Sequence, residues 1–407
     1  MKLLHTADWH LGDRLGRIDR TDDLRRSVER IAEYCRQERV DVLLLAGDIF
    51  SELARPDGLR DAVRHLQATF GGFLHDGGTI LAVTGNHDNE NFCQTLRHAM
   101  NLAAPIAVGF GAVAPAGRLF LADEPTLLRL HDRHTHSDVQ FVLMPYPTPS
   151  RFLVNDPLQK YGSFEEKMCH LRDAFAGRLR DIRTDPRFDS RLPTILVAHV
   201  HVYGAQVTNL FRLSEDEDVV FTDEQLPSAY SYVALGHIHK PQALGGYAHV
   251  RYCGSIERLD LGEFLDRKEV TLFELGPSGV VGQPMSLPLD ATPIYDVEIT
   301  NPQQELPALR GRYLDHATAL VNLHVNYTAG VDNLEAVLRE LDAIFPRWYG
   351  RDWVESRSVG PALTIGAPPA KSFEETVRDY LTGELTNYSD EDRAAILELA
   401  ENLLHDD

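Results

Sequence analysis

Cysteine and long apolar runs are both scarce in this chain. Its 407 residues include only 4 cysteines, none in CxxC spacing, which argues against a disulfide framework or a zinc knuckle and suits reduced thiols. The longest apolar runs, such as residues 42–46 and 195–198, are strand-sized and fall far short of the roughly 20 residues of a membrane-spanning helix. Polar residues follow Leu4 too early for the apolar segment of a signal peptide. We therefore expect a soluble, cytoplasmic protein.

Basic residues are also few. The chain has 40 Lys and Arg against 61 Asp and Glu, a net charge of -21, whereas a protein that binds nucleic acid unaided normally carries a basic excess. This argues against strong solitary DNA binding but does not exclude a nuclease, because divalent cations or a partner can supply positive charge. One local group of arginines is equally consistent with a solvated surface and with phosphate contact: Arg14, Arg17, Arg20, Arg25 and Arg26.

The remaining composition is that of a folded globular protein, with 43% hydrophobic and 25% charged residues. Apolar periodicity predicts a strand at residues 2–6, a helix at 22–37 and a strand at 40–46. Strands and helices continue to alternate as far as residue 275. This alternation indicates an α/β fold with helices packed on sheet faces.

Composition divides the chain into four parts. Prolines and glycines cluster over residues 276–293, which we interpret as a boundary that closes a catalytic domain at residues 1–288. Residues 289–358 predict a small α+β domain of two strands and one helix. Residues 359–370 have the composition of a linker. Residues 371–407 predict two amphipathic helices that fold back on the body or dock on a partner.

Five short polar segments each lie at the end of a predicted strand. The carboxyl ends of strands are where α/β sheets place their ligand sites, so we expect these segments to converge. Each segment alone is more often a structural feature, but five in one chain point to a metal site. Carboxylate, amide and imidazole without thiolate favour Mn, Fe or Zn. The segments are Asp8-Trp9-His10, Gly47-Asp48, Gly85-Asn86-His87-Asp88, Ala198-His199-Val200-His201 and Gly236-His237-Ile238-His239.

The order of these segments resembles the calcineurin-like metallophosphoesterases, and within them the nucleases of DNA double-strand-break repair. The resemblance covers residues 1–240. The segment Tyr252-Cys253-Gly254-Ser255, the small domain and the helical tail also resemble those nucleases. The resemblance implies a β-sandwich flanked by helices, a small α+β capping domain that binds DNA, and a helical C-terminal tail.

The resemblance also implies two metal ions. One ion would be held by Asp8, His10 and His239, the other by Asn86, His199 and His237, with Asp48 bridging the two. A bridging carboxylate offsets the repulsion between two dications about 3.5 to 4 Å apart, and such a pair polarises a phosphate and activates water. Manganese is the implied activator, with Mg²⁺, Fe²⁺ or Zn²⁺ as alternatives.

Several neighbouring residues allow two interpretations. The resemblance selects His199 as a ligand, and His201 stays the alternative. His87 resembles a histidine that protonates the leaving group or stabilises the transition state; a third ligand or a structural histidine is the alternative. Asp88 would orient an imidazole or cap a turn. For Trp9 we expect packing rather than stacking on DNA.

The resemblance implies a nucleoid-associated DNA nuclease of repair, recombination and replication, which degrades duplex ends from 3′ to 5′ and cuts single strands and hairpins. It also implies a homodimer through helices near residues 59–70 and 92–102. An SMC-like ATPase would bind residues 371–407 and supply any ATP dependence, because the chain has no G-x-x-x-x-G-K-[ST] loop.

Two rival functions remain. One is a phosphodiesterase for cyclic nucleotides or other small phosphoesters, against which the region after residue 288 argues. The other is a DNA-end tethering subunit with a vestigial site, against which the complete ligand set argues.

Overall fold

A computed structural model describes most of the chain up to residue 356. The described residues are 1–103, 113–114, 117–153, 161–207, 219–222 and 226–356. Residues 1–356 form one unit and residues 357–407 another. The linker and tail helices predicted at 359–370 and 371–407 therefore lie outside the described residues. None of the described helices is long and apolar enough to cross a membrane.

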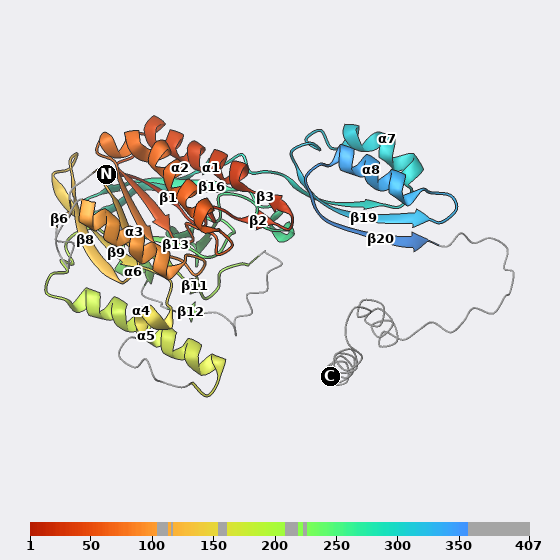
Figure 1. Ribbon diagram of the computed structural model, residues 1–407. Coiled ribbons are helices and arrows are strands. Elements are labelled where there is room, and N and C mark those ends of the chain that lie inside the picture. Colours follow the sequence, from red (N-terminus) through yellow and green to blue (C-terminus); the bar gives the residue numbers. More distant parts are fainter. Residues whose placement is uncertain (104–112, 115–116, 154–160, 208–218, 223–225, 357–407) are drawn as a thin grey trace. The chain divides into compact units, whose positions relative to one another are not determined.

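Two β-sheets packed face to face form the centre of the fold (Figure 1). The six-stranded sheet has the order β17 (Gly279–Pro288), β16 (Glu269–Gly276), β1 (Lys2–Thr6), β4 (Val42–Ala46), β5 (Thr79–Val83) and β7 (Leu119–Ala122). The seven-stranded sheet has the order β14 (Gln242–Leu244), β15 (Tyr247–Tyr252), β13 (Tyr232–Gly236), β10 (Thr194–His199), β9 (Ser137–Met144), β8 (Thr126–Asp132) and β6 (Val113–Ala114). Leu3 from one sheet and Ile195 from the other belong to the core between them.

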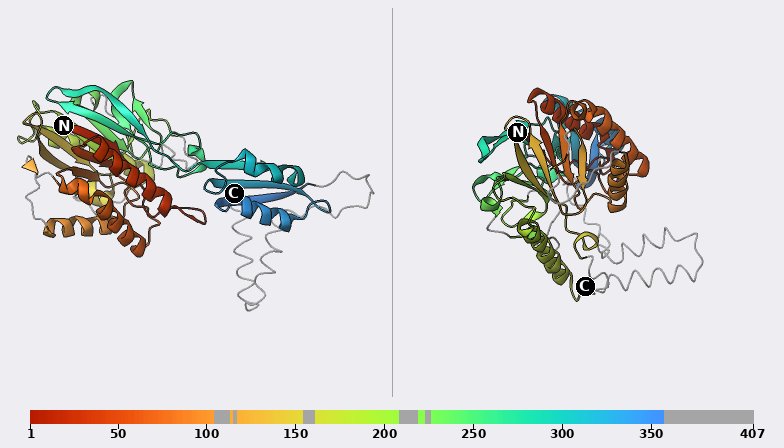
Figure 2. Two further views of the ribbon diagram at one scale, coloured as in Figure 1. Left: turned by 90° about the horizontal axis from the view of Figure 1, so that it is seen from above. Right: turned by 90° about the vertical axis from the view of Figure 1, so that its left-hand side faces the viewer.

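Helices cover both outer faces of this sandwich (Figure 2). The six-stranded sheet is covered by α1 (Thr21–Gln37), α2 (Pro56–His75) and α3 (Glu90–Ala103), and the seven-stranded sheet by α4 (Pro149–Phe152), α5 (Phe164–Thr184) and α6 (Leu226–Ala229). Central strands are apolar on both faces because both are covered: Leu3 faces the other sheet and Leu4 faces the helices. The predicted β-sandwich flanked by helices is confirmed.

Residues 294–356 form a separate sheet, which we call the three-stranded module. Its parallel strands are β18 (Ile294–Ile299), β19 (Leu320–Thr328) and β20 (Trp348–Ser356), and α7 (Pro302–Arg312) and α8 (Leu334–Ile344) pack on it. The Asn301 and Asn333 side chains cap the two helices by accepting from the N–H groups of Gln304 and Ala336. The prediction of two strands and one helix therefore missed β20 and α7, the latter because Pro307 lies inside it.

The proline- and glycine-rich stretch at residues 276–293 is mostly not a loop. The strand β17 occupies 279–288 and pairs antiparallel with β16. Gly279, with φ 115°, supplies the left-handed backbone of the tight turn between them. The predicted boundary after residue 288 falls between β17 and β18 and stays a prediction, whereas most of the stretch before it is strand. Glycine there serves a β-hairpin.

The arginines after the first polar segment divide by burial. Arg20 is fully buried and pairs with Asp23 (Nε–Oδ2 2.7 Å) and Glu257 (Nη2–Oε2 3.1 Å), so neither a solvated nor a phosphate-binding role fits it. Arg17 donates to the Trp348 carbonyl at 2.9 Å and lies 3.8 Å from the centre of that indole ring. Arg14 is half exposed and lies 3.8 Å from Asp19, in the hairpin of β2 (Arg14–Leu15) and β3 (Ile18–Asp19).

Candidate metal centre

The five polar segments meet where the central strands of the two sheets end. β1, β4 and β5 run parallel in one sheet, and β10 runs parallel to β13 in the other, so their carboxyl ends lie at one edge. The two sheets approach closely there: His199 Nδ1 lies 2.7 Å from the carbonyl oxygen of Ala46 on the opposite sheet. Gly47 permits this approach, since a Cβ at that residue would lie 2.1 Å from the same ring nitrogen.

Strained backbone is concentrated at this edge. Positive φ angles occur at Asp8 (52°), His10 (45°), Asp48 (50°) and His237 (96°), a conformation that costs a non-glycine residue on the order of 1–3 kcal/mol. Backbone hydrogen bonds maintain it, with the Asp8 N–H donating to the Gly47 carbonyl at 3.0 Å and the His10 N–H to the Asp48 carbonyl at 2.9 Å. Such strain is characteristic of sites whose side chains must be aimed in fixed directions.

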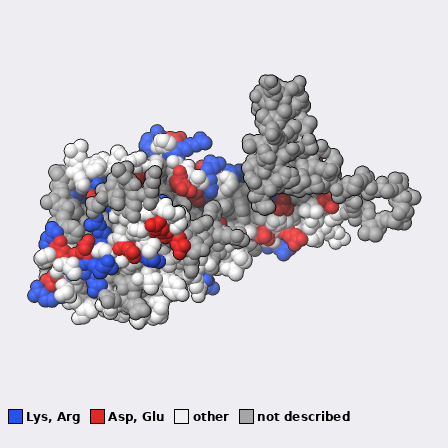
Figure 3. Space-filling model, turned by 90° about the horizontal axis from the view of Figure 1, so that it is seen from below, with Lys and Arg blue, Asp and Glu red and all other residues white. Residues whose placement is uncertain are grey.

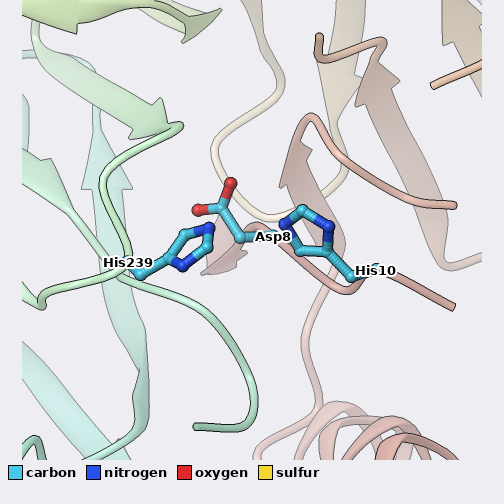
Figure 4. Close-up of side chains that lie close together, drawn as sticks. All are labelled: Asp8, His10 and His239. Atoms are coloured by element: carbon cyan, nitrogen blue, oxygen red, sulfur yellow. The ribbon is translucent and has the colours of Figure 1, made fainter. Parts of the chain in front are cut away.

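One ligand group consists of Asp8, His10 and His239. One ligand atom from each lies within 4.8 Å of the others, and Figure 4 shows the two imidazole rings on either side of the Asp8 carboxylate. Asp8 Oδ2 and His10 Nε2 are buried without a hydrogen-bond partner among the described residues. Leaving a polar atom in that state costs about 1–3 kcal/mol, so this pair of atoms fits a cation.

A second group adjoins the first. Asp8, Asp48 and His199 also bring ligand atoms within 4.8 Å of one another. The Asn86 side-chain oxygen lies 3.0 Å from His199 Nε2 and 3.0 Å from His237 Nδ1. Asp48 Oδ2 lies between the groups, 3.5 Å from His10 Nε2 and 3.3 Å from His199 Nε2. One carboxylate oxygen therefore faces an imidazole nitrogen of each group.

Burial and neighbouring charges shift the titration of these groups. Burial raises the pKa of Asp8, and the nearby Asp48 carboxylate adds to that effect. Burial acts in the same direction on Asp48, but the charge and hydrogen bond of His199, together with the charges of His10 and His87, outweigh it and hold the pKa of Asp48 well below its usual range. Burial lowers the pKa of His10 to about 3. The site therefore favours a neutral His10 imidazole, the form that ligates metals.

His87 lies beside these groups. Its backbone N–H donates to Asp48 Oδ1 at 2.9 Å, while its side chain is 35% exposed and its ring centre lies 5.0 Å from that of His10. It belongs to neither group of ligand atoms within 4.8 Å. The ring therefore borders the ligand groups from the solvent side.

The neighbouring Asp88 and His201 have different surroundings. Asp88 is buried and accepts N–H groups from Ile49, Phe50 and Gly85 at 3.2, 2.8 and 2.8 Å, the geometry of turn capping. Burial, together with the Asp48 charge, raises the pKa of Asp88 to about 6. His201 is buried in β11 (His201–Val202), its ring 6.3 Å from that of His237, and it belongs to neither ligand group.

Two residues that the sequence did not reveal also belong to the site. Glu263, in the 3₁₀ helix η1 (Leu261–Glu263), accepts from His239 Nδ1 at 2.8 Å, and Lys268 donates to Glu263 at 2.6 Å. They lie more than twenty residues after His239 in a segment without a motif. Only the folded chain brings them behind the ligand.

Comparisons with known proteins point to one family. A family model described as calcineurin-like phosphoesterase matches residues 1–241. The chain is 27% identical over 283 residues to the SbcD subunit of the nuclease SbcCD from Bacillus subtilis (strain 168), which covers 68% of this chain and 67% of that protein. The protein of the same name from Escherichia coli (strain K12) is 30% identical over 286 residues, 67% of this chain and 64% of its own length. The matches thus span about two thirds of these relatives.

Proposed function

Because the chain belongs to the calcineurin-like phosphoesterase family, we propose that it is a metal-dependent nuclease that hydrolyses DNA phosphodiesters. The observation that carries this proposal is the position of Asp48 Oδ2 between two groups of buried ligands. DNA as the substrate is supported by the relatives that are named as part of the nuclease SbcCD. The site alone would accept any phosphodiester of suitable shape.

The donors divide into two metal positions. Asp8, His10 and His239 would hold one ion, and Asn86, His199 and His237 the other, with Asp48 shared. Two bound ions would polarise the scissile phosphate and lower the pKa of a water molecule. Oxygen and nitrogen donors without thiolate suit Mn²⁺, Fe²⁺ or Zn²⁺. The family resemblance favours Mn²⁺ among them, with Mg²⁺ as a further alternative.

His87 is the proposed catalytic residue. Its ring borders His10 and is partly open to solvent, so it can reach a phosphate that enters the site. Its backbone N–H is fixed on Asp48, which keeps the residue next to the proposed metal positions. An imidazole both donates and accepts protons near neutral pH. We assign it leaving-group protonation or stabilisation of the transition state.

The similarity to these relatives also suggests a role for the chain in a larger complex. Their membership of a nuclease named SbcCD supports a complex in which an SMC-like ATPase, SbcC, binds residues 371–407 of this chain. Residues 1–288 would then be the nuclease domain and residues 289–358 a capping domain that contacts DNA. The complex would degrade duplex ends from 3′ to 5′ and cut single strands and hairpins in the cytoplasm, with homodimerisation through α2 and α3.

A partner also fits the surface charge. On the face drawn in Figure 3, acidic and basic side chains are interspersed among the described residues and form no continuous basic stripe. With a net charge of -21, the chain has little long-range attraction for DNA. The bound metal ions and the ATPase partner would supply the positive charge that DNA requires.

The test compares two substrates with the full chain and Mn²⁺: a labelled linear duplex and a cyclic nucleotide, each with a D48N control. We expect cleavage of the duplex by the wild-type chain and none by D48N. Hydrolysis of the cyclic nucleotide alone would identify a small-molecule phosphodiesterase instead. DNA binding without cleavage of either substrate would identify a tethering protein.

A further inference from the structure

A buried ion pair lies directly behind the proposed ligand His239. Lys268 Nζ and Glu263 Oε2 are 2.6 Å apart, and both side chains are 0% exposed. Burying two charges costs several kcal/mol per ion unless both are well paired and hydrogen-bonded. Apolar residues of similar volume would often stabilise the fold as well or better, so the distinctive feature of this pair is where its hydrogen bonds go.

Every donor of the lysine is directed at this part of the site. Lys268 Nζ donates to Glu263 Oε2, to Ser255 Oγ at 2.8 Å and to the His239 carbonyl at 2.9 Å. An ammonium group has three N–H donors, and these three contacts use them all. Lys268 thus fixes the backbone of His239 directly and the Glu263 carboxylate at the same time.

The glutamate fixes the ring. Glu263 Oε1 lies 2.8 Å from His239 Nδ1. An ionised carboxylate only accepts hydrogen bonds, so Nδ1 carries the proton and the lone pair of Nε2 is left for the ligand group with Asp8 and His10.

From this geometry we infer that Glu263 and Lys268 are positioning residues that orient His239 and set the affinity of one metal position selectively. The inference rests on the proposed function. The other position is built differently, because His199 Nδ1 is held by the backbone carbonyl of Ala46. No substitution of a side chain at residue 46 removes that acceptor. A side-chain substitution at Glu263 should therefore lower the metal affinity of one position and leave that of the other unchanged.

The test titrates Mn²⁺ into the full-length chain by calorimetry, with Mn²⁺ electron paramagnetic resonance to count bound ions. We expect two ions on the wild-type chain. In E263Q one affinity should fall roughly 10- to 100-fold, the range for loss of a partner that orients a metal ligand, while the other stays unchanged. The double variant E263Q/K268M leaves no unpaired buried charge and should show the same selective loss.

The matched control is E257Q. Glu257 is also buried and pairs with Arg20, and its carboxylate accepts hydrogen bonds from Arg20, Ser27, Arg258 and Thr292, none of them a proposed ligand. Its backbone carbonyl, which E257Q keeps, accepts from Ser255 at 2.8 Å. We expect E257Q to lower thermal stability and to keep both affinities.

Three results would overturn the inference: equal weakening of both positions in E263Q, an unchanged pair of affinities in E263Q and in the double variant, or selective loss in E257Q. Each leaves the proposed function intact, because the wild-type chain would still bind two ions. A wild-type chain that binds no Mn²⁺ would overturn the proposed function and this inference together.

Discussion

Two buried carboxylate clusters in this chain balance their negative charge in opposite ways. Asp23 accepts from Arg20, Arg26 and Arg347 at 2.7, 2.6 and 2.5 Å. Burial acts to raise its pKa, but the hydrogen bond from Arg347 and the charge of Arg20 outweigh this and lower it to about 2. This cluster contains its own positive charge. It joins α1 to the three-stranded module through Arg347.

Asp8 and Asp48 have no such partner. Across the described part of the chain, neither forms an ion pair with a lysine or an arginine; their charged neighbours are imidazoles. Asp8 Oδ2 has no hydrogen bond at all there. Buried aspartates therefore fall into two classes in this fold. Asp23 links two parts of the chain through ion pairs with arginines, whereas Asp8 and Asp48 are suited to positive charge from a bound cation.

The largest effect should follow removal of the bridging carboxylate. We predict that D48N lowers Mn²⁺-dependent hydrolysis of a generic aryl phosphodiester by at least about 1000-fold, because both metal positions share Asp48 and metal ions supply several kcal/mol of transition-state stabilisation. Initial rates at saturating Mn²⁺ measure this. Retention of more than a tenth of the wild-type rate would remove the distinction between the two clusters.

The next largest effect should be a loss of hydrolysis rate in a variant of His87 that still binds both metal ions. We predict that H87Q lowers the rate about 100- to 10,000-fold, the usual contribution of a positioned acid or base, while two Mn²⁺ ions stay bound. Rates and Mn²⁺ counts on the same preparation measure this. Loss of one ion would instead make His87 a ligand.

The Asp23 cluster should respond in stability. We predict that D23N lowers the free energy of unfolding by about 3 kcal/mol at pH 7, since it removes a buried counter-ion that Arg20, Arg26 and Arg347 share, and that it keeps both Mn²⁺ ions. Chemical denaturation measures the first and calorimetry the second. Lost Mn²⁺ binding with unchanged stability would reverse the roles of the two clusters.

The same variant carries a pH dependence. The pKa of Asp23 is lowered from 3.8 to about 2 by folding, so its stabilisation is fully present above pH 4 and is lost as the pH falls toward 2. We predict that the difference in unfolding free energy between wild type and D23N shrinks from pH 4 to pH 2. A difference that grows as the pH falls would contradict the assignment of Asp23 as the charged partner of these arginines.

Deletion of the C-terminal residues should have the smallest effect on catalysis. Deleting residues 371–407 should leave Mn²⁺-dependent hydrolysis of the aryl phosphodiester unchanged, because both clusters lie in residues 1–356. It should also abolish co-purification with the SbcC ATPase. Co-purification of the shortened chain would contradict the proposed docking role.

The candidate site could be proposed from the sequence because its signals are local. An Asp-x-His, Gly-Asp or His-x-His segment after a strand is visible in a few residues, and the parallel topology then brings such segments together. The packing role expected for Trp9 was confirmed for the same reason. It is 1% exposed and its ring lies 5.9 Å from that of Phe70.

What the sequence hid depends on long-range contacts. Glu263 and Lys268 look like ordinary surface charges until the fold buries them behind His239. Arg20 looks like its exposed neighbours but reaches Glu257, 237 residues away. Whether a charged side chain can be buried depends on its ion-pair partner, and a local sequence pattern does not reveal a partner that is distant in the sequence.

The central claim, that the cluster around Asp48 holds two metal ions, is tested most directly by counting Mn²⁺ on the full-length chain. Calorimetric titration of wild type, D48N and D23N should give two ions for wild type and D23N and fewer than two for D48N. A wild-type chain without bound Mn²⁺, or a D48N chain that keeps both ions, would contradict the account.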